Sequence, residues 1–231
     1  MDPGAGLSSR PADPEVVLPA LYERLQAYWG NLGWWPAESP FEVIVGAILT
    51  QNAAWQNVEK AITALKREAV LSPACLRDLS EDRLAEWIRP AGYYRLKASR
   101  LKAFIRFLDE RYAGNLDRMF AQPAERLREA LLSVNGIGPE TADSILLYAG
   151  GKPVFVVDAY TKRILCRHGM IPEDADYPTL QGLFMRHLPA EAPLFNQYHA
   201  LLVHTGKTFC RKKPLCAGCP LEPPVGPGEA R

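Results

Sequence analysis

Apolar residues recur along most of the chain at the spacing of an α-helix. Residues three or four positions apart share one helix face, so each set predicts a helix with one buried side. About ten such helices fit the pattern, which predicts an all-α fold. The sets include Leu18, Leu21, Leu25 and Tyr28, then Phe41, Ile44, Val45 and Ile48, then Val58, Ile62 and Leu65, then Leu101, Ile105 and Leu108, then Leu127, Leu131 and Val134, and finally Ala142, Ile145, Leu146 and Ala149.

Local signals indicate where helices begin and where the chain is extended. Ser80, Asp158 and the segment "AQPAERL" are typical helix starts. The segment "PVFVVD" (153–158) has the composition of a buried strand, but it is isolated. Because one strand alone makes no sheet, we expect an extended lead-in to the next helix. Both ends, 1–13 and 221–231, are rich in Pro and Gly and are predicted to be disordered tails.

The composition limits the class of protein. Hydrophobic residues make up 48% of the 231 residues, which is enough for a sizeable core, and the formal net charge is only +1. No apolar run has membrane-spanning length, and no basic-then-apolar leader begins the sequence. We therefore expect a soluble, cytoplasmic monomer with no membrane partner. If the chain binds nucleic acid, its basic residues must be concentrated locally.

A glycine turn, Gly136-Ile137-Gly138, joins two short amphipathic segments and predicts a helical hairpin. Glycine permits positive φ and lets a second backbone approach closely. The free N–H groups at the start of the second helix favour a phosphate, and Pro139 fits that first turn. An ordinary connection with a glycine C-cap explains the same residues, so the turn alone does not decide between the two.

Asp158 ends the extended segment and precedes "AYTKRILCRHG". Aspartate is a preferred N-cap, so its ordinary role is to cap that helix. A carboxylate that accepts backbone N–H bonds stays ionised, which is also what stabilising a cation or orienting a water requires.

Four motifs in order resemble the endonuclease III superfamily of DNA glycosylases, over about residues 16 to 220. They are "FEVIVGAILTQNAAWQNVEKAITAL", "IRPAGYYRLKASRLKAFI", "GIGPETADSILLYAG" followed by "PVFVVDAYTKRIL", and the C-terminal cysteines. The resemblance implies two helical lobes with a DNA cleft between them. One lobe is residues 34–152, with the helix-hairpin-helix, and the other is 14–33 plus 153–220.

The resemblance also implies that the enzyme flips a damaged base out of double-stranded DNA. Gln51 would fill the vacated space, and the loop 92–95 would wedge the opposite strand. The hairpin and a basic loop would contact phosphates. The implied DNA-binding residues are Gln51, Tyr93, Tyr94, Arg95, Gly136, Gly138, Lys207, Arg211, Lys212 and Lys213. In a protein of another fold, Gln51 would be an ordinary polar residue at a helix end. The segment 92–95 would be a surface loop, and the basic residues would be a solvated run of charges.

Asp158 matches the family's catalytic aspartate, which would stabilise the oxocarbenium-like sugar. Strand-cleaving members carry a lysine just past the hairpin, which forms a Schiff base with the sugar. Here that position is Glu140, which predicts a monofunctional enzyme using water. Glu140 either orients that water or only complements the helix dipole. Lys152 and Lys162 are nearby in sequence, and either amine could replace the missing lysine and give weak lyase activity.

The segment "GWWPAESPF" resembles the superfamily branch that excises 3-methyladenine, which also has an acid at the hairpin position. A methylated purine is cationic, and indole faces attract it by stacking and cation–π interaction. We expect Trp34, Trp35, Pro36 and Trp55 to form the base pocket. Packing in the core is the ordinary alternative for any tryptophan.

Cys210, Cys216 and Cys219 have metal-ligand spacing, and the resemblance implies an iron–sulfur cluster. The family's fourth cysteine would fall at Val225. A 4Fe-4S cluster with a non-cysteine fourth ligand is therefore favoured. The alternatives are a 3Fe-4S cluster, zinc completed by a residue such as His204, and no metal.

Three functions fit these observations. The first is a monofunctional glycosylase for alkylated purines. The second is an endonuclease III-type glycosylase and AP lyase for oxidised pyrimidines. The third is a non-catalytic binder of damaged DNA.

Overall fold

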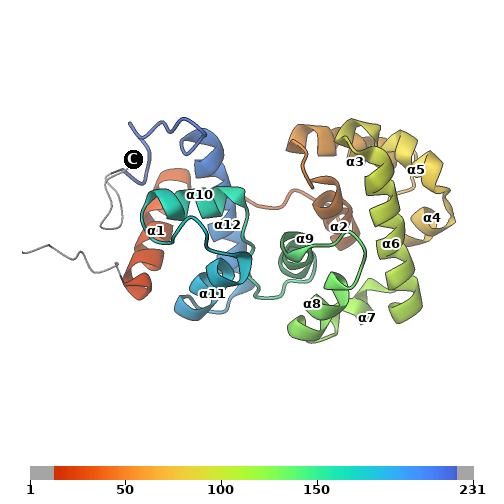
Figure 1. Ribbon diagram of the computed structural model, residues 1–231. Coiled ribbons are helices and arrows are strands. Elements are labelled where there is room, and N and C mark those ends of the chain that lie inside the picture. The colour runs from red at the N-terminus through yellow and green to blue at the C-terminus, as the bar shows by residue number, and fades with distance from the viewer. Residues whose placement is uncertain (1–12, 223–231) are drawn as a thin grey trace, which may run out of the picture. The chain divides into compact units, whose positions relative to one another are not determined.

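The computed structural model describes residues 13–222, and every regular element in that range is a helix (Figure 1). The prediction of an all-α fold is confirmed. No helix among these residues has the length and apolarity needed to cross a membrane. The predicted tails fall outside the described residues, except for their innermost positions. Asp13 accepts a 3.0 Å hydrogen bond from the N–H of Glu15, and Leu221 is 2% exposed, so both belong to the ordered fold.

The described chain divides into two compact units, 35–154 and 13–34 with 155–222. The boundaries expected from the sequence, 34–152 and 14–33 with 153–220, differ from these by one or two residues. The unit 35–154 is continuous in sequence, and the other unit is built from both ends of the chain.

The unit 35–154 is built around α2 (Pro40–Leu49), in which nine of ten residues are buried. Ser39 caps this helix by accepting a 3.2 Å hydrogen bond from the N–H of Glu42. Helices α3, α6, α9 and η2 all pack against α2. The elements of this unit are α2, α3 (Trp55–Arg67), α4 (Pro73–Asp78), α5 (Glu81–Trp87), the short 3₁₀-helix η1 (Arg89–Ala91), α6 (Tyr94–Tyr112), α7 (Leu116–Phe120), α8 (Ala124–Leu132), α9 (Pro139–Ser144) and the π-helix η2 (Ile145–Ala149).

Two cations, Lys97 and Arg128, hold this unit together through one fully buried and one partly buried side chain. Lys97 is 1% exposed and donates 2.8 Å hydrogen bonds to the carbonyls of Leu49 and Ala91. It thereby satisfies the last carbonyl of α2, and burial lowers the pKa of its amine. Arg128 on α8 makes a bidentate pair with Asp143 on α9, at 2.6 and 3.0 Å, and the Asp143 side chain is fully buried. This pair locks the two helices of the hairpin.

The second unit packs α1 (Pro14–Trp29), α10 (Ala159–Arg167) and α11 (Tyr177–His187) with α12 (Ala192–Thr208). The segment 152–158 has no regular structure and leads directly into α10, as predicted. It is nevertheless firmly anchored. Phe155 stacks on Phe184 with ring centres 3.8 Å apart, and its carbonyl accepts a 2.7 Å hydrogen bond from Gln181. The helix start that follows it is therefore held in place.

We predict that Arg128→Met lowers the free energy of unfolding by about 3–5 kcal/mol, because it leaves the buried Asp143 carboxylate without its guanidinium. Urea denaturation at neutral pH measures the change. Arg83→Met is the control, because Arg83 forms its 3.0 Å pair with Glu86 at the surface, where such pairs contribute little. A change for Arg128→Met as small as that of the control contradicts the prediction.

Candidate functional site

The hairpin between α8 and α9 has the geometry that the glycine turn predicts. Gly136 has φ +85°, and a Cβ there would lie 2.4 Å from Cγ of Arg100. Glycine is therefore required by both conformation and packing. A Cβ on Gly138 would meet nothing within 4 Å, so the start of α9 faces open space. Ile137 between them is 5% exposed and anchors the turn in the core.

Gln51 binds this hairpin directly. Its amide nitrogen donates 2.9 Å hydrogen bonds to the carbonyl of Gly136 and to the hydroxyl of Thr141. Its amide oxygen accepts a hydrogen bond from Arg100 on α6. The insertion of Gln51 into DNA stays a prediction, and it requires these bonds to break. Arg100 was not found from the sequence, because its position on α6 belongs to no motif.

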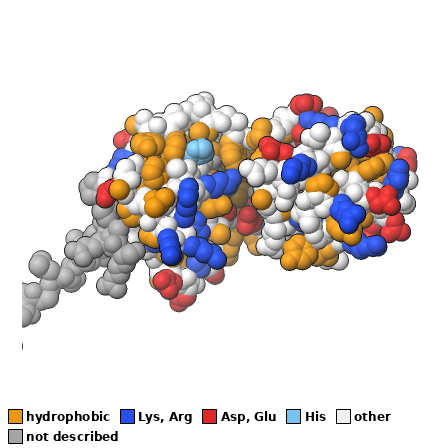
Figure 2. All heavy atoms as spheres, turned by 90° about the horizontal axis from the view of Figure 1, so that it is seen from above, with side chains coloured by type: hydrophobic (Ala, Val, Ile, Leu, Met, Phe, Trp, Pro, Cys, Tyr) orange, Lys and Arg blue, Asp and Glu red, His pale blue; other side chains and the backbone are white. Residues whose placement is uncertain are grey.

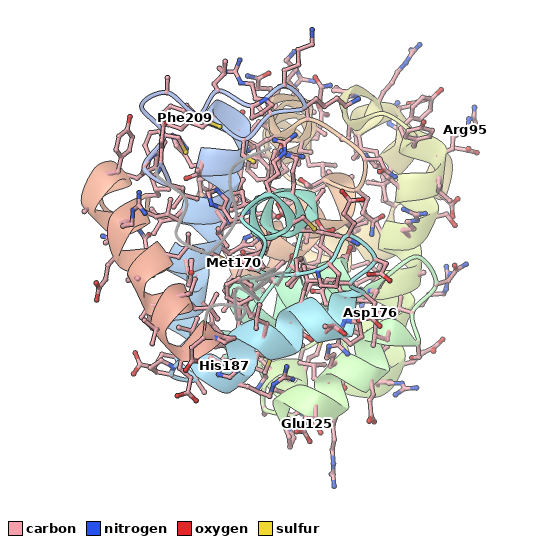
Figure 3. The ribbon with its side chains drawn as sticks, turned by 60° about the vertical axis from the view of Figure 1, so that its left-hand side comes forward. Arg95, Glu125, Met170, Asp176, His187 and Phe209 are labelled. Atoms are coloured by element: carbon pink, nitrogen blue, oxygen red, sulfur yellow. The ribbon has the colours of Figure 1, made fainter. Side chains whose placement is uncertain are left out.

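The loop before α6 presents two exposed apolar side chains. Tyr93 has left-handed φ and ψ (45° and 33°) and is 71% exposed, and Leu96 is 51% exposed. Arg95 also points outward (Figure 3), with a side chain that is 78% exposed. Tyr94 differs, because it packs against the core beneath the loop. Of the predicted loop residues, Tyr93 and Arg95 are thus available to a partner, and Leu96 joins them.

The predicted pocket tryptophans belong to different units. Trp35 meets Trp55 edge-to-face and lies against Tyr148 of η2, with ring centres 5.1 Å apart in both pairs. Gly46 permits this approach, because a Cβ there would lie 3.2 Å from the Trp35 ring. We call Trp35, Trp55 and Tyr148 the aromatic group. Tyr148 was not found from the sequence, because it lies outside the apolar set that ends at Ala149.

Trp34 lies in the other unit, where the ammonium of Lys207 is 5.7 Å from its ring centre. This is a cation–π contact, so the Trp34 ring already faces a positive charge. Pro36 is exposed. Trp34 and Pro36 therefore make no part of the aromatic group itself.

Asp158 is the N-cap of α10, as predicted. One of its carboxylate oxygens accepts hydrogen bonds from the N–H and the hydroxyl of Thr161, at 2.7 and 2.9 Å. The other oxygen lies 3.8 Å from Nε2 of His199 on α12. The Asp158 side chain is only 12% exposed. This carboxylate is fixed in position and has one oxygen directed at a buried imidazole.

His199 is the residue that sequence reasoning missed at this site. Burial lowers its pKa, although the charge of Asp158 opposes that shift and Lys207 adds to it. The imidazole is therefore favoured in its neutral form. Nothing in the sequence distinguishes His199 from other polar residues of an amphipathic helix.

The residues around the second catalytic position are exposed. Glu140 lies in the first turn of α9, and Ser144 donates a 2.7 Å hydrogen bond to its carbonyl. It belongs to the unit 35–154, and Asp158 belongs to the other unit. Of the two lysines considered as substitute amines, Lys162 donates a 2.8 Å hydrogen bond to the carbonyl of Ala175 and shares the unit of Asp158.

Cys210, Cys216 and Cys219 all line one cavity of about 90 Å³ in the loop after α12. Arg167, at the end of α10, donates a hydrogen bond to Sγ of Cys210 at 3.2 Å and another to the carbonyl of Arg211 at 2.6 Å. Burial raises the pKa of the Cys219 thiol. The loop is thus held to α10 by a guanidinium that also touches a candidate ligand.

Three soft sulfur donors around one cavity fit an iron–sulfur cluster, in which each cysteine binds a different iron. Within residues 13–222, no three His, Cys, Asp or Glu side chains lie close enough to hold a single metal ion. His204, the alternative ligand considered for zinc, is not among the described residues that line the cavity. Its ring packs edge-on against Trp29, with centres 4.3 Å apart. Val225 lies outside the described residues.

The predicted phosphate-binding cations are at the surface. Arg211, Lys212, Lys213 and Lys207 are all exposed. Arg167 binds the carbonyls of Arg211 and Lys212 and so fixes the backbone of the loop. The Arg211 side chain donates a 3.1 Å hydrogen bond to the carbonyl of Lys207, and the Lys207 ammonium faces the Trp34 ring. Figure 2 shows Lys and Arg side chains gathered on the unit that contains both ends of the chain.

Comparison with known proteins agrees with this geometry. Residues 45–189 match the family described as HhH-GPD superfamily base excision DNA repair protein. A candidate DNA repair glycosylase of Methanocaldococcus jannaschii is 50% identical over 204 residues, which are 87% of this chain and 92% of that protein. Endonuclease III of Thermotoga maritima is 30% identical over 181 residues, 78% of this chain and 79% of that protein.

Solved structures give the same fold. The Helicobacter pylori 3-methyladenine DNA glycosylase MagIII, bound to 1,N6-ethenoadenine, has a TM-score of 0.73 and 29% identity. The match covers 84% of this chain and 97% of that one. A trapped covalent complex of endonuclease III with DNA has a TM-score of 0.76 at 23% identity, covering 90% and 93% of the two chains.

We predict that Gly136→Ala lowers the free energy of unfolding by about 1–3 kcal/mol, because it combines positive φ with a collision against Arg100. Gly138→Ala is the matched control, since its φ is negative and a Cβ there meets nothing. Thermal or urea denaturation measures both. Equal losses for the two variants contradict the prediction.

We also predict that the protein loses stability as the pH falls below about 6.5, the usual pKa of histidine. The folded state lowers the pKa of His199, so the unfolded state binds a proton first and acid favours it. The stabilisation is complete above the unfolded pKa and is lost as the pH falls towards the folded pKa. His199→Gln should therefore flatten the dependence of the unfolding free energy on pH between 7.5 and 5, and His187→Gln serves as control. An unchanged slope in His199→Gln overturns this assignment.

Proposed function

This chain belongs to the HhH-GPD superfamily of base excision DNA repair proteins, and we propose that it is a monofunctional DNA glycosylase that removes alkylated purines from double-stranded DNA. The coarser statement, a base excision repair glycosylase, is supported by the family match and by the 50% identical relative. The proposed substrate, an alkylated purine, rests on the aromatic group, and the proposed hydrolytic mechanism rests on Asp158.

The proposed reaction type rests on the fixed position of the Asp158 carboxylate. The carboxylate is fixed by two hydrogen bonds from Thr161. A fixed, largely buried negative charge stabilises the positive charge that develops on the sugar as the glycosidic bond breaks. The same carboxylate orients the water that attacks the sugar carbon. The neutral imidazole of His199 supports Asp158 from within the unit without neutralising it.

Glu140 favours hydrolysis over strand cleavage. A carboxylate cannot form the Schiff base on which lyase activity depends. The exposed position of Glu140 at the start of α9 is compatible with a role near the sugar, where it helps orient the water. Complementing the dipole of α9 is its other role, and the two are compatible.

The aromatic group supports a cationic purine as the substrate. An indole face attracts a cation with about 0.5–2 kcal/mol. Trp35 and Trp55, with Tyr148 beside them, give such faces in a half-buried setting. The 29% identical MagIII is described as a 3-methyladenine glycosylase, which favours the same substrate class here. The positive charge of a methylated base also weakens its bond to the sugar, so strong acid catalysis is unnecessary.

DNA binding divides between the two units in this proposal. The hairpin at Gly136–Gly138 and the exposed cations of the cysteine loop bind phosphates. Tyr93 and Leu96 press on the strand opposite the lesion. Gln51 leaves its hydrogen bonds to the hairpin and occupies the space of the flipped base.

The cofactor in this proposal is an iron–sulfur cluster held by Cys210, Cys216 and Cys219. When bound, it cross-links the loop that carries Arg211, Lys212 and Lys213, and its role is structural. Arg167 holds the same loop through Cys210 Sγ and main-chain carbonyls, so the cluster and the guanidinium act together on one basic surface.

The second candidate function is an endonuclease III-type enzyme for oxidised pyrimidines. The observation in its favour is the 30% identity to the Thermotoga maritima endonuclease III over most of both chains. It differs from the first proposal in needing an amine nucleophile. Lys162 lies in the same unit as Asp158, and its ammonium would have to leave the carbonyl of Ala175 to serve.

We predict that Asp158→Asn reduces release of 3-methyladenine from duplex DNA by about 100-fold or more. Asp176→Asn is the matched control, because Asp176 caps α11 through a 2.9 Å bond from Thr179 in the same way. The control is expected to retain full activity. Full activity in Asp158→Asn rejects the catalytic role of Asp158. No release by the wild-type chain from any damaged DNA favours the non-catalytic binder.

The substrate panel contains 3-methyladenine, thymine glycol and abasic sites, and borohydride is added to trap Schiff bases. We expect base release from the alkylated DNA and little trapping. Efficient trapping rejects the monofunctional mechanism. Release of thymine glycol without 3-methyladenine rejects the proposed substrate in favour of the second candidate.

A further inference from the structure

The cysteine loop supplies three thiolates, and a cubane cluster has four irons to be ligated. At the family's fourth position this chain has Val225, which has no donor atom in its side chain. The fourth ligand must therefore come from elsewhere in the chain, or one iron has no protein ligand. The walls of the cavity show which side chains are within reach.

Four polar side chains line this cavity besides the three cysteines: Arg167, His168, Thr205 and Glu222. Arg167 is only a donor, and it already binds Cys210 Sγ and the loop carbonyls. The hydroxyl of Thr205 accepts a 2.9 Å hydrogen bond from the indole of Trp29. Glu222 is exposed, where water solvates its carboxylate. Of these four side chains, His168 is the one with a buried ligand atom that has no hydrogen-bond partner among residues 13–222.

Nδ1 of His168 is buried and has no hydrogen-bond partner among residues 13–222. Leaving such a group unsatisfied costs about 1–3 kcal/mol, so a buried orphan nitrogen needs a reason. An imidazole nitrogen is a common ligand of transition metals, and binding a metal satisfies its lone pair. His168 and the three cysteines line the same cavity.

The position of His168 is well defined. It is the C-cap of α10, and its N–H donates a 3.1 Å hydrogen bond to the carbonyl of Ile164. Arg24 on α1 ties the far end of the cysteine loop to this region through the carbonyls of Pro220 and Glu222, at 3.0 and 2.9 Å. His168 therefore lies at the end of α10, and the cysteine loop is bound by arginines of α10 and α1.

We propose that His168 is the fourth ligand of the iron–sulfur cluster held by Cys210, Cys216 and Cys219. This inference rests on the cofactor in the proposed function. A single histidine among three cysteines makes one iron differ from the other three. Histidine ligation also raises the reduction potential of a cluster relative to all-cysteine ligation.

The test uses the full chain, purified without oxygen, as wild type, His168→Ala and His168→Cys. Iron and sulfide content, the visible spectrum and electron paramagnetic resonance are measured on each. We expect about four irons per chain in the wild type. His168→Ala should lose about one iron as Fe²⁺, and one-electron oxidation of the remaining cluster with ferricyanide should then give the paramagnetic signal of an oxidised 3Fe-4S cluster. His168→Cys should keep its iron, with a lowered reduction potential.

A second readout does not depend on the Ala variant folding. Pulsed resonance of the reduced wild-type cluster should detect a strongly coupled nitrogen from the imidazole, and His168→Cys should lose that coupling. His204→Ala is the matched control, because His204 packs on Trp29 outside the cavity, and it should retain the coupling. Base release is measured in parallel on all four proteins.

The outcomes separate the two proposals. A wild-type chain with a full cluster but without the nitrogen coupling overturns the His168 assignment and leaves the cofactor in place. The same conclusion follows if His168→Ala and His168→Cys match the wild type. A wild-type chain without iron overturns both the cofactor and the assignment, and base release then decides independently whether the glycosylase function stands.

Discussion

The burial of α2 is the constraint from which the unit 35–154 follows. A ten-residue apolar helix must be covered on every side, so the chain winds α3, α6, α9 and η2 around it. Such a helix must also satisfy its end groups, and Ser39 and Lys97 do so at its two ends. Gln51 follows directly after the last turn. The position of the residue that binds the hairpin is therefore fixed by the most buried helix of the unit.

The same hydrogen bonds that start or end helices also prepare groups for chemistry. Asp158 is first of all a cap, and Thr161 gives it two donors. Those donors hold the carboxylate in one position, and a fixed carboxylate is what stabilising a sugar cation demands. At the other end of α10, the C-cap His168 directs an unsatisfied nitrogen into buried space. One short helix thus carries both candidate sites of its unit at its ends.

The sequence predicted what depends on local spacing. Helix periodicity, the cap at Ser80 and the extended segment 153–158 are all confirmed, because neighbours in sequence determine them. Contacts between residues that are far apart in the chain could not be predicted from local spacing. Gln51 and Gly136 are 85 residues apart, and nothing local shows that they bond. His168 was missed for the same reason, and Trp34 was grouped with its neighbour although the boundary between the units falls between them.

The division of the chain also orders events during synthesis. Residues 35–154 emerge as one continuous stretch, and contacts within them form without waiting for the rest. Helix α1 is made first but completed last, because the carbonyl of Leu18 meets the hydroxyl of Tyr198, 180 residues further on. The helices that it packs against, α11 and α12, leave the ribosome only after the unit 35–154. Slow formation of this long-range contact is where exposure of apolar surface, and hence a need for chaperones, is greatest.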